Sequence, residues 1–155
     1  MSEPLAYFLT WTTYGTWLHG DGRGSVDRSN AAAGLDYHAP NPAWQAASHR
    51  RMKALGVVLS PRQRELVEQA VREHAAHKGW RILALTCRSN HVHLVVTADG
   101  TAAERVMTEM KAYATRTLRA EGEATAERLW TRHGSTRYLR APASLHAAMR
   151  YVETQ

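Results

Sequence analysis

Two histidines separated by one residue are the first side chains whose type and spacing indicate chemistry. His91 and His93 lie in the segment Asn-His-Val-His-Leu, which opens an apolar run ending at Val96. Side chains alternate between the two faces of a β-strand, so both imidazoles project from one face, about 7 Å apart. Neighbouring imidazoles bind divalent metal ions. The spacing therefore predicts either a metal site or two ordinary half-buried strand histidines, and this short motif alone does not decide between them.

The composition limits the class of protein. A chain of 155 residues with 44% hydrophobic residues is long enough for one globular domain, which we expect to span residues 1–155. Its apolar runs are too short to cross a bilayer, and the N-terminal residues lack the pattern of a secretory signal. The single cysteine, Cys87, excludes an intrachain disulfide and fits a small buried strand residue in a reducing compartment. We therefore expect a cytoplasmic protein with no membrane partner.

The charge balance favours a nucleic-acid partner. The net charge is +6, and 17 of the 20 basic residues are arginine. Arginine binds phosphate through a planar, two-pronged guanidinium group. A GC-rich genome offers another explanation for the share of arginine, although not obviously for the net charge.

A glycine-rich segment follows a first predicted strand at residues 5–14. Residues 15–28 contain four glycines, and Arg23 and Arg28 are placed to neutralise a phosphate there. The segment matches no known phosphate-loop pattern, so a plain surface loop is an equally good interpretation. It also carries three possible additional metal ligands: His19, Asp21 and Asp27.

The rest of the chain alternates helical and strand patterns. We expect helices at about 41–54, at 60–79 with a capping box from Ser60 to Gln63, at 101–121 with a capping box from Thr101 to Glu104, and from Pro142 onward. Strands are expected at 80–87, at the histidine motif and at 135–139, and the first two of these form a hairpin through residues 88–90. The order predicts an α+β, ferredoxin-like (split βαβ) antiparallel sheet covered by helices.

A tyrosine on the predicted helix 101–121 is a second candidate. An apolar stripe on this helix should face the sheet, and it consists of Ala103, Met107, Met110, Ala114 and Leu118. Tyr113 lies near the border of the stripe, flanked by Lys111, Arg116 and Arg119. On its own, this position favours a boundary residue with a buried ring and a solvated hydroxyl. His74, on the preceding helix, is expected to have no function.

The combination of motifs resembles the single-tyrosine transposases of the HUH superfamily, which belong to the IS200-like transposases, and above all their REP-associated branch. The resemblance is carried by four segments: residues 13–21 with 24–28, Arg88–Leu94, Met110–Arg116 and Trp130–Leu139. It implies an HUH endonuclease fold that cleaves and rejoins single-stranded DNA containing palindromic hairpins, as a monomer or homodimer. His91 and His93 would hold Mg²⁺ or Mn²⁺ at the scissile phosphate. Tyr113 would be the nucleophile and form a 5′-phosphotyrosine, with Arg23, Arg28, Lys111, Arg116 and Arg119 contacting DNA.

The third metal ligand departs from the family pattern. The family places an amide one helical turn after the tyrosine, and here the corresponding residue is Thr117. Thr117 acting through water, Glu109 or Asp21 are the substitutes we consider, and a weak metal site or a degenerate enzyme is the alternative.

Two other functions remain open at this stage. A non-catalytic module would bind single strands by stacking bases on aromatic residues, for which Trp11, Tyr14, Trp17 and Trp80 are the candidates. A metal-dependent phosphoesterase would use water as its nucleophile and form no covalent adduct.

Overall fold

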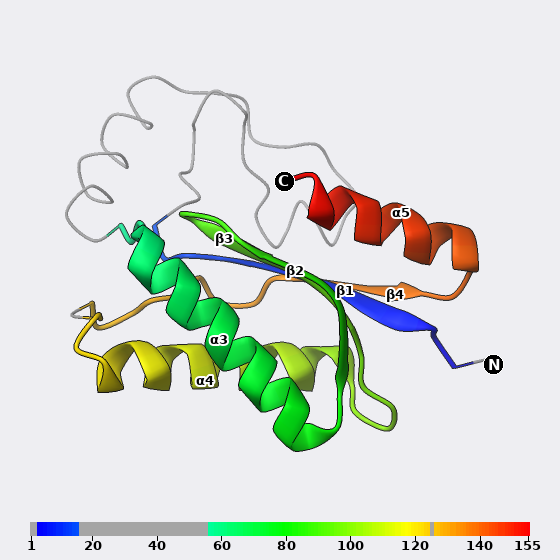
Figure 1. Cartoon of the computed structure of the whole chain (residues 1–155), viewed down its shortest axis with the longest axis horizontal. Coiled ribbons are helices and arrows are strands. Elements are labelled where there is room, and N and C mark those ends of the chain that lie inside the picture. Colours follow the sequence, from blue (N-terminus) through cyan, green and yellow to red (C-terminus); the bar gives the residue numbers. More distant parts are fainter. Residues whose placement is uncertain (1–2, 16–55, 125) are drawn as a thin grey trace, which may run out of the picture. The chain divides into compact units, whose positions relative to one another are not determined.

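The computed structural model describes residues 3–15, 56–124 and 126–155 of the chain. The chain divides into two compact units, one formed by Met1–Thr13 with Val58–Gln155 and the other by Tyr14–Val57. All the described helices and strands belong to the first unit (Figure 1). The predicted helix at 41–54 lies outside the described residues, and a single domain over 1–155 stays a prediction.

A four-stranded antiparallel sheet forms the centre of the first unit. Its strands are β1 (Ala6–Thr12), β2 (Arg81–Cys87), β3 (His91–Thr97) and β4 (Ser135–Leu139), in the order β2-β3-β1-β4. The helices are α3 (Pro61–Lys78), α4 (Ala103–Ala120) and α5 (Pro142–Glu153). The β-α-β-β-α-β order with one additional C-terminal helix is the ferredoxin-like plan that the sequence predicts.

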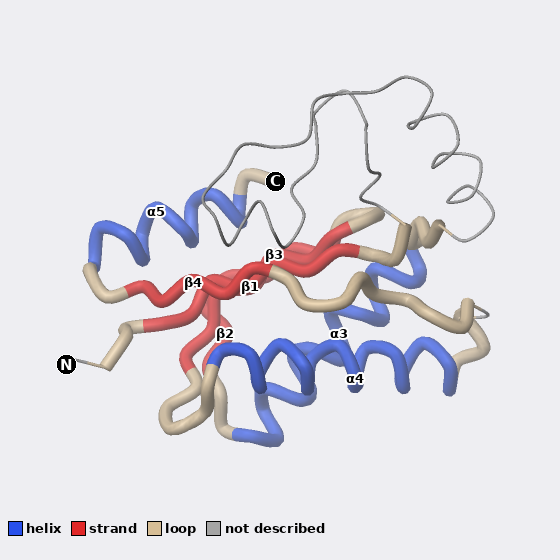
Figure 2. Tube along the Cα trace, turned by 180° about the vertical axis from the view of Figure 1, so that it is seen from behind, coloured by secondary structure: helices blue, strands red, loops and turns tan. Residues whose placement is uncertain are grey.

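The helices lie on both faces of the sheet. Figures 1 and 2 show α3 and α4 on one face and α5 on the other. Val92, Leu94 and Val96 are fully buried on the face that carries α3 and α4. On the opposite face, Phe8 and Val95 pack against Ala148 and Val152 of α5. The apolar stripe of α4 is buried as predicted, because Ala103, Met107, Met110, Ala114 and Leu118 are all nearly inaccessible.

Local sequence signals set most of the element boundaries. The Ser60 hydroxyl accepts a hydrogen bond from the Gln63 backbone N–H, and the Gln63 side chain accepts one from the Ser60 N–H, so the predicted capping box of α3 is present. Gly79 ends α3 with a positive φ of 76°, which glycine adopts without steric cost. The hairpin between β2 and β3 turns through residues 88–90, where the Arg88 N–H donates to the His91 carbonyl.

The predicted capping box of α4 is wrong. Ala102 is the N-cap residue, and no side chain caps the helix there. Glu104 instead accepts hydrogen bonds from the hydroxyls of Thr136 and Tyr138 on β4, which is the tertiary reason why its carboxylate does not turn back to the helix start.

Candidate active site

His91 and His93 lie side by side, as the strand alternation predicts. Their ring centroids are 4.6 Å apart and the ring planes meet at 65°. His93 is buried with 7% of its surface exposed, whereas His91 is only partly buried. Thr10 of β1 pairs with His93 in register, so the two side chains lie on the same face of the sheet. The pair therefore lies at the sheet face covered by α5.

Each imidazole is oriented by an oxygen at its Nδ1 atom. His93 Nδ1 is 2.8 Å from Thr10 Oγ1, and His91 Nδ1 is 2.8 Å from Asn90 Oδ1. The Asn90 oxygen can only accept a hydrogen bond, so His91 carries its proton on Nδ1 and keeps a lone pair on Nε2. In metal-binding histidines, one ring nitrogen typically forms a hydrogen bond with a protein oxygen while the other nitrogen binds the metal ion.

Burial keeps both histidines neutral near pH 7. The pKa of His93 is lowered to about 4, mainly by desolvation and to a smaller extent by the charge of the nearby His91. Desolvation and the positive charge of Arg88 also lower the pKa of His91. A neutral imidazole offers a lone pair to a cation without first losing a proton, so the chemistry of this donor pair fits a divalent metal ion.

Tyr151 of α5 lies beside His93. Its ring centroid is 5.4 Å from that of His93 and 6.0 Å from that of Phe8. Its side chain is 48% exposed, so the phenol is accessible from solvent. Tyr151 and His93 line the same cleft between α5 and the edge of the sheet, which has a volume of about 480 Å³. Tyr151 is not among the site residues predicted from the sequence.

The predicted convergence of Tyr113 with the histidines is wrong within one chain. Tyr113 lies on α4, and its ring stacks on His74 of α3 with centroids 3.9 Å apart. Both helices cover the face of the sheet opposite to His91 and His93 (Figure 2). The physical reason is topological, because the two right-handed crossovers of a split βαβ unit place both crossover helices on the same face.

Two of the three predicted substitutes for a third metal ligand lie in the layer of α3 and α4. Thr117 is on α4, and Glu109 of α4 is hydrogen bonded to His74 and Arg105. Asp21 lies outside the described residues, as do His19 and Asp27. In the described part of the chain, no three His, Cys, Asp or Glu side chains cluster as a metal site would require. A third protein ligand from these ranges must therefore be of another type.

The sequence carries an amide near Tyr151. Gln155 follows Tyr151 by four residues, which is the amide spacing that Tyr113 lacks. α5 ends at Glu153, and the Gln155 N–H donates to the Val152 carbonyl at 3.3 Å, so the backbone continues the helical turn to Gln155. Tyr151 and Gln155 are thus one turn apart at the C-terminal end of α5.

The basic residues predicted to contact DNA on α4 already have partners in the protein. Lys111 donates hydrogen bonds to the backbone carbonyls of Thr131 and His133, and desolvation lowers its pKa. Arg119 donates to the Glu127 carbonyl at 3.0 Å, and Arg116 lies 4.8 Å from the centroid of the Tyr113 ring.

These three side chains line a groove with Trp130, away from the histidines. Their role in DNA binding stays a prediction, and Arg23 and Arg28 lie outside the described residues.

The core tryptophans are not available for base stacking. Trp11 is fully buried, and only 8% of Trp80 is exposed. Tyr14 is partly buried, and Trp17 lies outside the described residues. Trp11 and Trp80 therefore contribute to the core, which is the more common role of strand aromatics, and not to a stacking surface.

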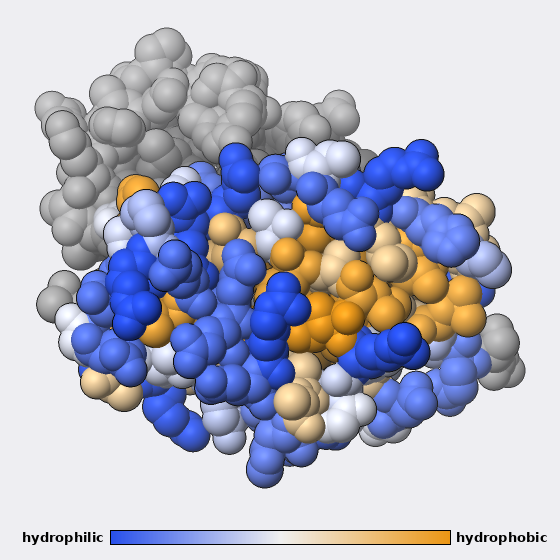
Figure 3. All heavy atoms as spheres, viewed as in Figure 1, coloured by the Kyte–Doolittle hydropathy of each residue, from blue (hydrophilic) through white to orange (hydrophobic). Residues whose placement is uncertain are grey.

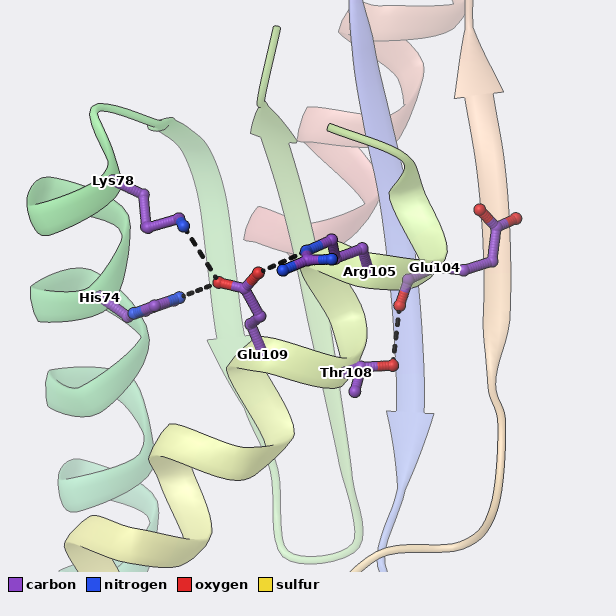
Figure 4. A network of polar contacts seen from close by, with 6 residues as sticks. All are labelled: His74, Lys78, Glu104, Arg105, Thr108 and Glu109. Carbon is purple, nitrogen blue, oxygen red and sulfur yellow. Dashed lines mark hydrogen bonds and ion pairs between the residues drawn. The ribbon is translucent and has the colours of Figure 1, made fainter. Parts of the chain in front are cut away.

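His74 belongs to a polar network between α3 and α4. Figure 4 shows its ring and Lys78 pointing toward the Glu109 carboxylate, with Arg105 on the other side. His74 Nε2 is 2.7 Å from Glu109 Oε1, and only 3% of the His74 side chain is exposed. Tyr113 stacks on this network, so its surroundings are those of a packing residue between two helices.

Comparisons with known proteins agree with the fold. The model of the family "Transposase IS200 like" matches residues 50–155, which include the histidines and Tyr151. The chain belongs to this family of transposases. No curated protein sequence matches it.

Two solved structures share its fold. One is a REP-associated tyrosine transposase bound to a REP hairpin, with 10% identity and a TM-score of 0.53, which covers 97% of this chain. This chain spans 66% of that protein, slightly less than two thirds of its length. The other is a putative transposase from Deinococcus radiodurans, with 16% identity and a TM-score of 0.51, covering 100% of this chain and 93% of that one. Both share the α+β arrangement of a four-stranded antiparallel sheet and helices.

In the described ranges, no helix combines the length and the apolar character needed to cross a bilayer.

Proposed function

We propose that this chain cleaves and rejoins single-stranded DNA by transesterification, with Tyr151 as the nucleophile. The observation that carries the proposal is the position of the Tyr151 ring 5.4 Å from His93, in a cleft that is open to solvent. Membership of a transposase family supports DNA as the substrate. The hairpin bound by the REP-associated transposase makes hairpin-containing single strands the first substrate to test.

His91 and His93 would hold Mg²⁺ or Mn²⁺ through their Nε2 atoms, with the amide oxygen of Gln155 as the third protein ligand. Such an ion draws negative charge from the non-bridging oxygens of the scissile phosphate and orients the phosphorus. Thr10 and Asn90 fix the ring orientation from the Nδ1 side. Gln155 supplies the oxygen ligand that Thr117 cannot, because Thr117 belongs to the opposite layer.

The Tyr151 hydroxyl oxygen attacks the phosphorus as its proton leaves to solvent, and the bond from phosphorus to the 3′ oxygen breaks. The departing oxygen takes up a proton and becomes a free 3′-hydroxyl, and the 5′ phosphate stays on Tyr151. The phosphotyrosine is still a phosphodiester, so a 3′-hydroxyl can attack it, restore the DNA strand and release the tyrosine. Rejoining therefore needs no nucleotide hydrolysis.

Paired tyrosine variants test the assignment. The purified chain is incubated with end-labelled single-stranded hairpin DNA and Mn²⁺, and adducts are resolved by denaturing electrophoresis. We expect an adduct with the unaltered chain and with Tyr113→Phe, and no adduct with Tyr151→Phe. Each substitution removes one hydroxyl and keeps the ring, so packing is matched.

Other outcomes identify the alternative functions. Loss of the adduct in Tyr113→Phe with its retention in Tyr151→Phe would reverse the assignment. Cleavage without any adduct would indicate a water-dependent phosphoesterase. Binding that is unchanged by a chelator, without cleavage, would indicate a non-catalytic nucleic-acid-binding module.

A further inference from the structure

The cleft beside Tyr151 continues along the sheet beyond the histidines. Its floor is formed by side chains that share one sheet face on β1, β3 and β4, and its wall by one side of α5. The lining residues are Phe8, Thr10, His93, Ser135, Arg137, Leu139, Ser144, Ala147, Ala148 and Tyr151. In register, Thr10 pairs with Ser135 and Phe8 with Arg137, so the cleft extends from the histidine end to the Arg137 end along the strands.

We propose that this cleft binds the nucleotide next to the scissile phosphate, with its base between Phe8 and the small side chains of α5 and its outer phosphate at Arg137. The proposal rests on the function proposed above, because it places the neighbouring part of the same DNA strand. Among the site residues predicted from the sequence, His93 is the one that lines this subsite.

Small side chains on α5 leave the room for a base. Ser144, Ala147, Ala148 and Tyr151 recur at intervals of three and four residues, so they share one side of the helix. Ala148 packs into the core cluster, whereas Ser144 and Ala147 border the cleft with side chains of at most two heavy atoms. Figure 3 views the molecule from the β2 side and shows hydrophobic residues gathered over β2 and α5, with hydrophilic residues around them. A planar, largely apolar base is a suitable occupant of such a cleft.

Arg137 supplies the positive charge at the outer end. Its guanidinium carbon lies 6.0 Å from the centroid of the Phe8 ring, and its side chain is exposed. The part of the chain that the structure describes contributes no carboxylate to the cleft lining. Arg137 is two positions along β4 from Ser135 at the histidine end, a distance of about 7 Å. This distance is comparable to the spacing of successive phosphates along an extended single strand.

Arg140 provides a matched control for Arg137. It lies on the neighbouring chain segment, 5.7 Å from the Tyr138 ring, and Tyr138 contacts Tyr7 and Glu104 on the face that carries α4. Removing either arginine changes the net charge by the same amount, but only Arg137 borders the cleft. A purely non-specific electrostatic effect would be similar for both variants.

Two probes separate base binding from phosphate binding. Fluorescence anisotropy is measured in EDTA with a labelled 15-mer of thymidylate and with an abasic 15-mer that has the same phosphates. We expect the unaltered chain to prefer the thymidylate strand by about tenfold, in the range of one stacked base. Ala147→Leu, which fills the cleft, should abolish that preference and leave binding of the abasic strand unchanged.

The arginine variants test the outer phosphate. Arg137→Ala should weaken both strands several-fold and reduce the slope of log affinity against log salt concentration by about 0.7. Arg140→Ala should reduce affinity less, and Arg137→Lys should restore part of the loss. Equal effects of Arg137→Ala and Arg140→Ala, or a base preference that survives Ala147→Leu, would overturn the proposal. Neither measurement requires cleavage, so failure of the nucleophile assignment would be seen separately in the adduct experiment.

Discussion

The Thr10 hydroxyl lies 2.8 Å from His93 Nδ1 and connects the first strand of the sheet to the candidate metal site. Thr10 and His93 are directly paired residues of β1 and β3, and both lie on the face covered by α5. The contact fixes the plane of the imidazole and leaves Nε2 for the metal ion that we propose. Its loss should affect the metal more than the fold.

Thr10→Val replaces the hydroxyl with a methyl group of similar volume. We expect Mn²⁺ affinity, measured by calorimetry, to fall about 10- to 100-fold, the usual effect of losing an outer-shell partner. Thr10→Ser keeps the hydroxyl and should bind Mn²⁺ nearly as well as the unaltered chain. Unchanged affinity in Thr10→Val would show that this hydroxyl does not orient a metal ligand.

The His74–Glu109 contact between α3 and α4 should contribute to stability. His74 is buried, so Glu109→Ala leaves its Nε2 without this partner, which we expect to cost about 2 kcal/mol of unfolding free energy. Glu109→Gln retains an oxygen acceptor and should lose less. Urea unfolding measures both, and a Glu65→Ala variant, which alters an exposed ion pair with Arg62, should change stability by less than about 1 kcal/mol.

The same carboxylate predicts a pH dependence. The hydrogen bond from His74, followed by that from Arg105 and the charge of Lys78, lowers the pKa of Glu109 below its ordinary value of 4.5, against an opposing effect of desolvation. Because this pKa is lower in the folded state, the ionised carboxylate stabilises the fold above about pH 4.5. This stabilisation is lost as the pH falls through the folded-state pKa. The stability difference between the unaltered chain and Glu109→Gln should therefore shrink below pH 4.5. A difference that stays constant down to pH 3 would exclude this account.

Gly134 allows the segment before β4 to pass close to β1. A Cβ atom at this position would lie 2.5 Å from the Thr10 carbonyl oxygen and 2.8 Å from Met107 Sδ. The carbonyl belongs to a central strand and cannot move freely, so Gly134→Ala should destabilise the fold by about 1–3 kcal/mol.

Gly122→Ala is a useful comparison, because nothing lies within 4 Å of its Cβ position and only its positive φ of 68° opposes the change. We expect it to cost about 1 kcal/mol in the same denaturant titration. A smaller effect at Gly134 than at Gly122 would contradict the steric explanation.

Cys87 should be chemically inert in the folded protein. It is 5% exposed, and desolvation together with the charge of Glu68 raises the pKa of its thiol to about 12. Thiolate is the reactive form, so modification by a disulfide reagent at pH 8 should be slow in the native chain and fast in urea. Rapid modification without denaturant would show that β2 opens or that the thiol is accessible.

The sequence by itself determined the local elements of this protein. Alternation along His91–Thr97 placed both histidines on one face, and the Ser60 capping box and Gly79 set the ends of α3, because these patterns depend only on near neighbours. The four-residue spacing of Tyr151 and Gln155 is an equally local signal, although the sequence pattern led us to predict Tyr113 as the nucleophile.

Only the tertiary structure decided which tyrosine meets the histidines. That choice depends on which helix covers which face of the sheet. The arrangement of the sheet is not a local property, because β1 pairs with β3 and β4, which are far from it in the sequence. Both crossover helices pack on the face of Leu94, so the histidine face is left to α5 and its tyrosine. Hydrophobic periodicity predicts that a helix buries one side, but strand order and crossover handedness select the face of the sheet that it covers.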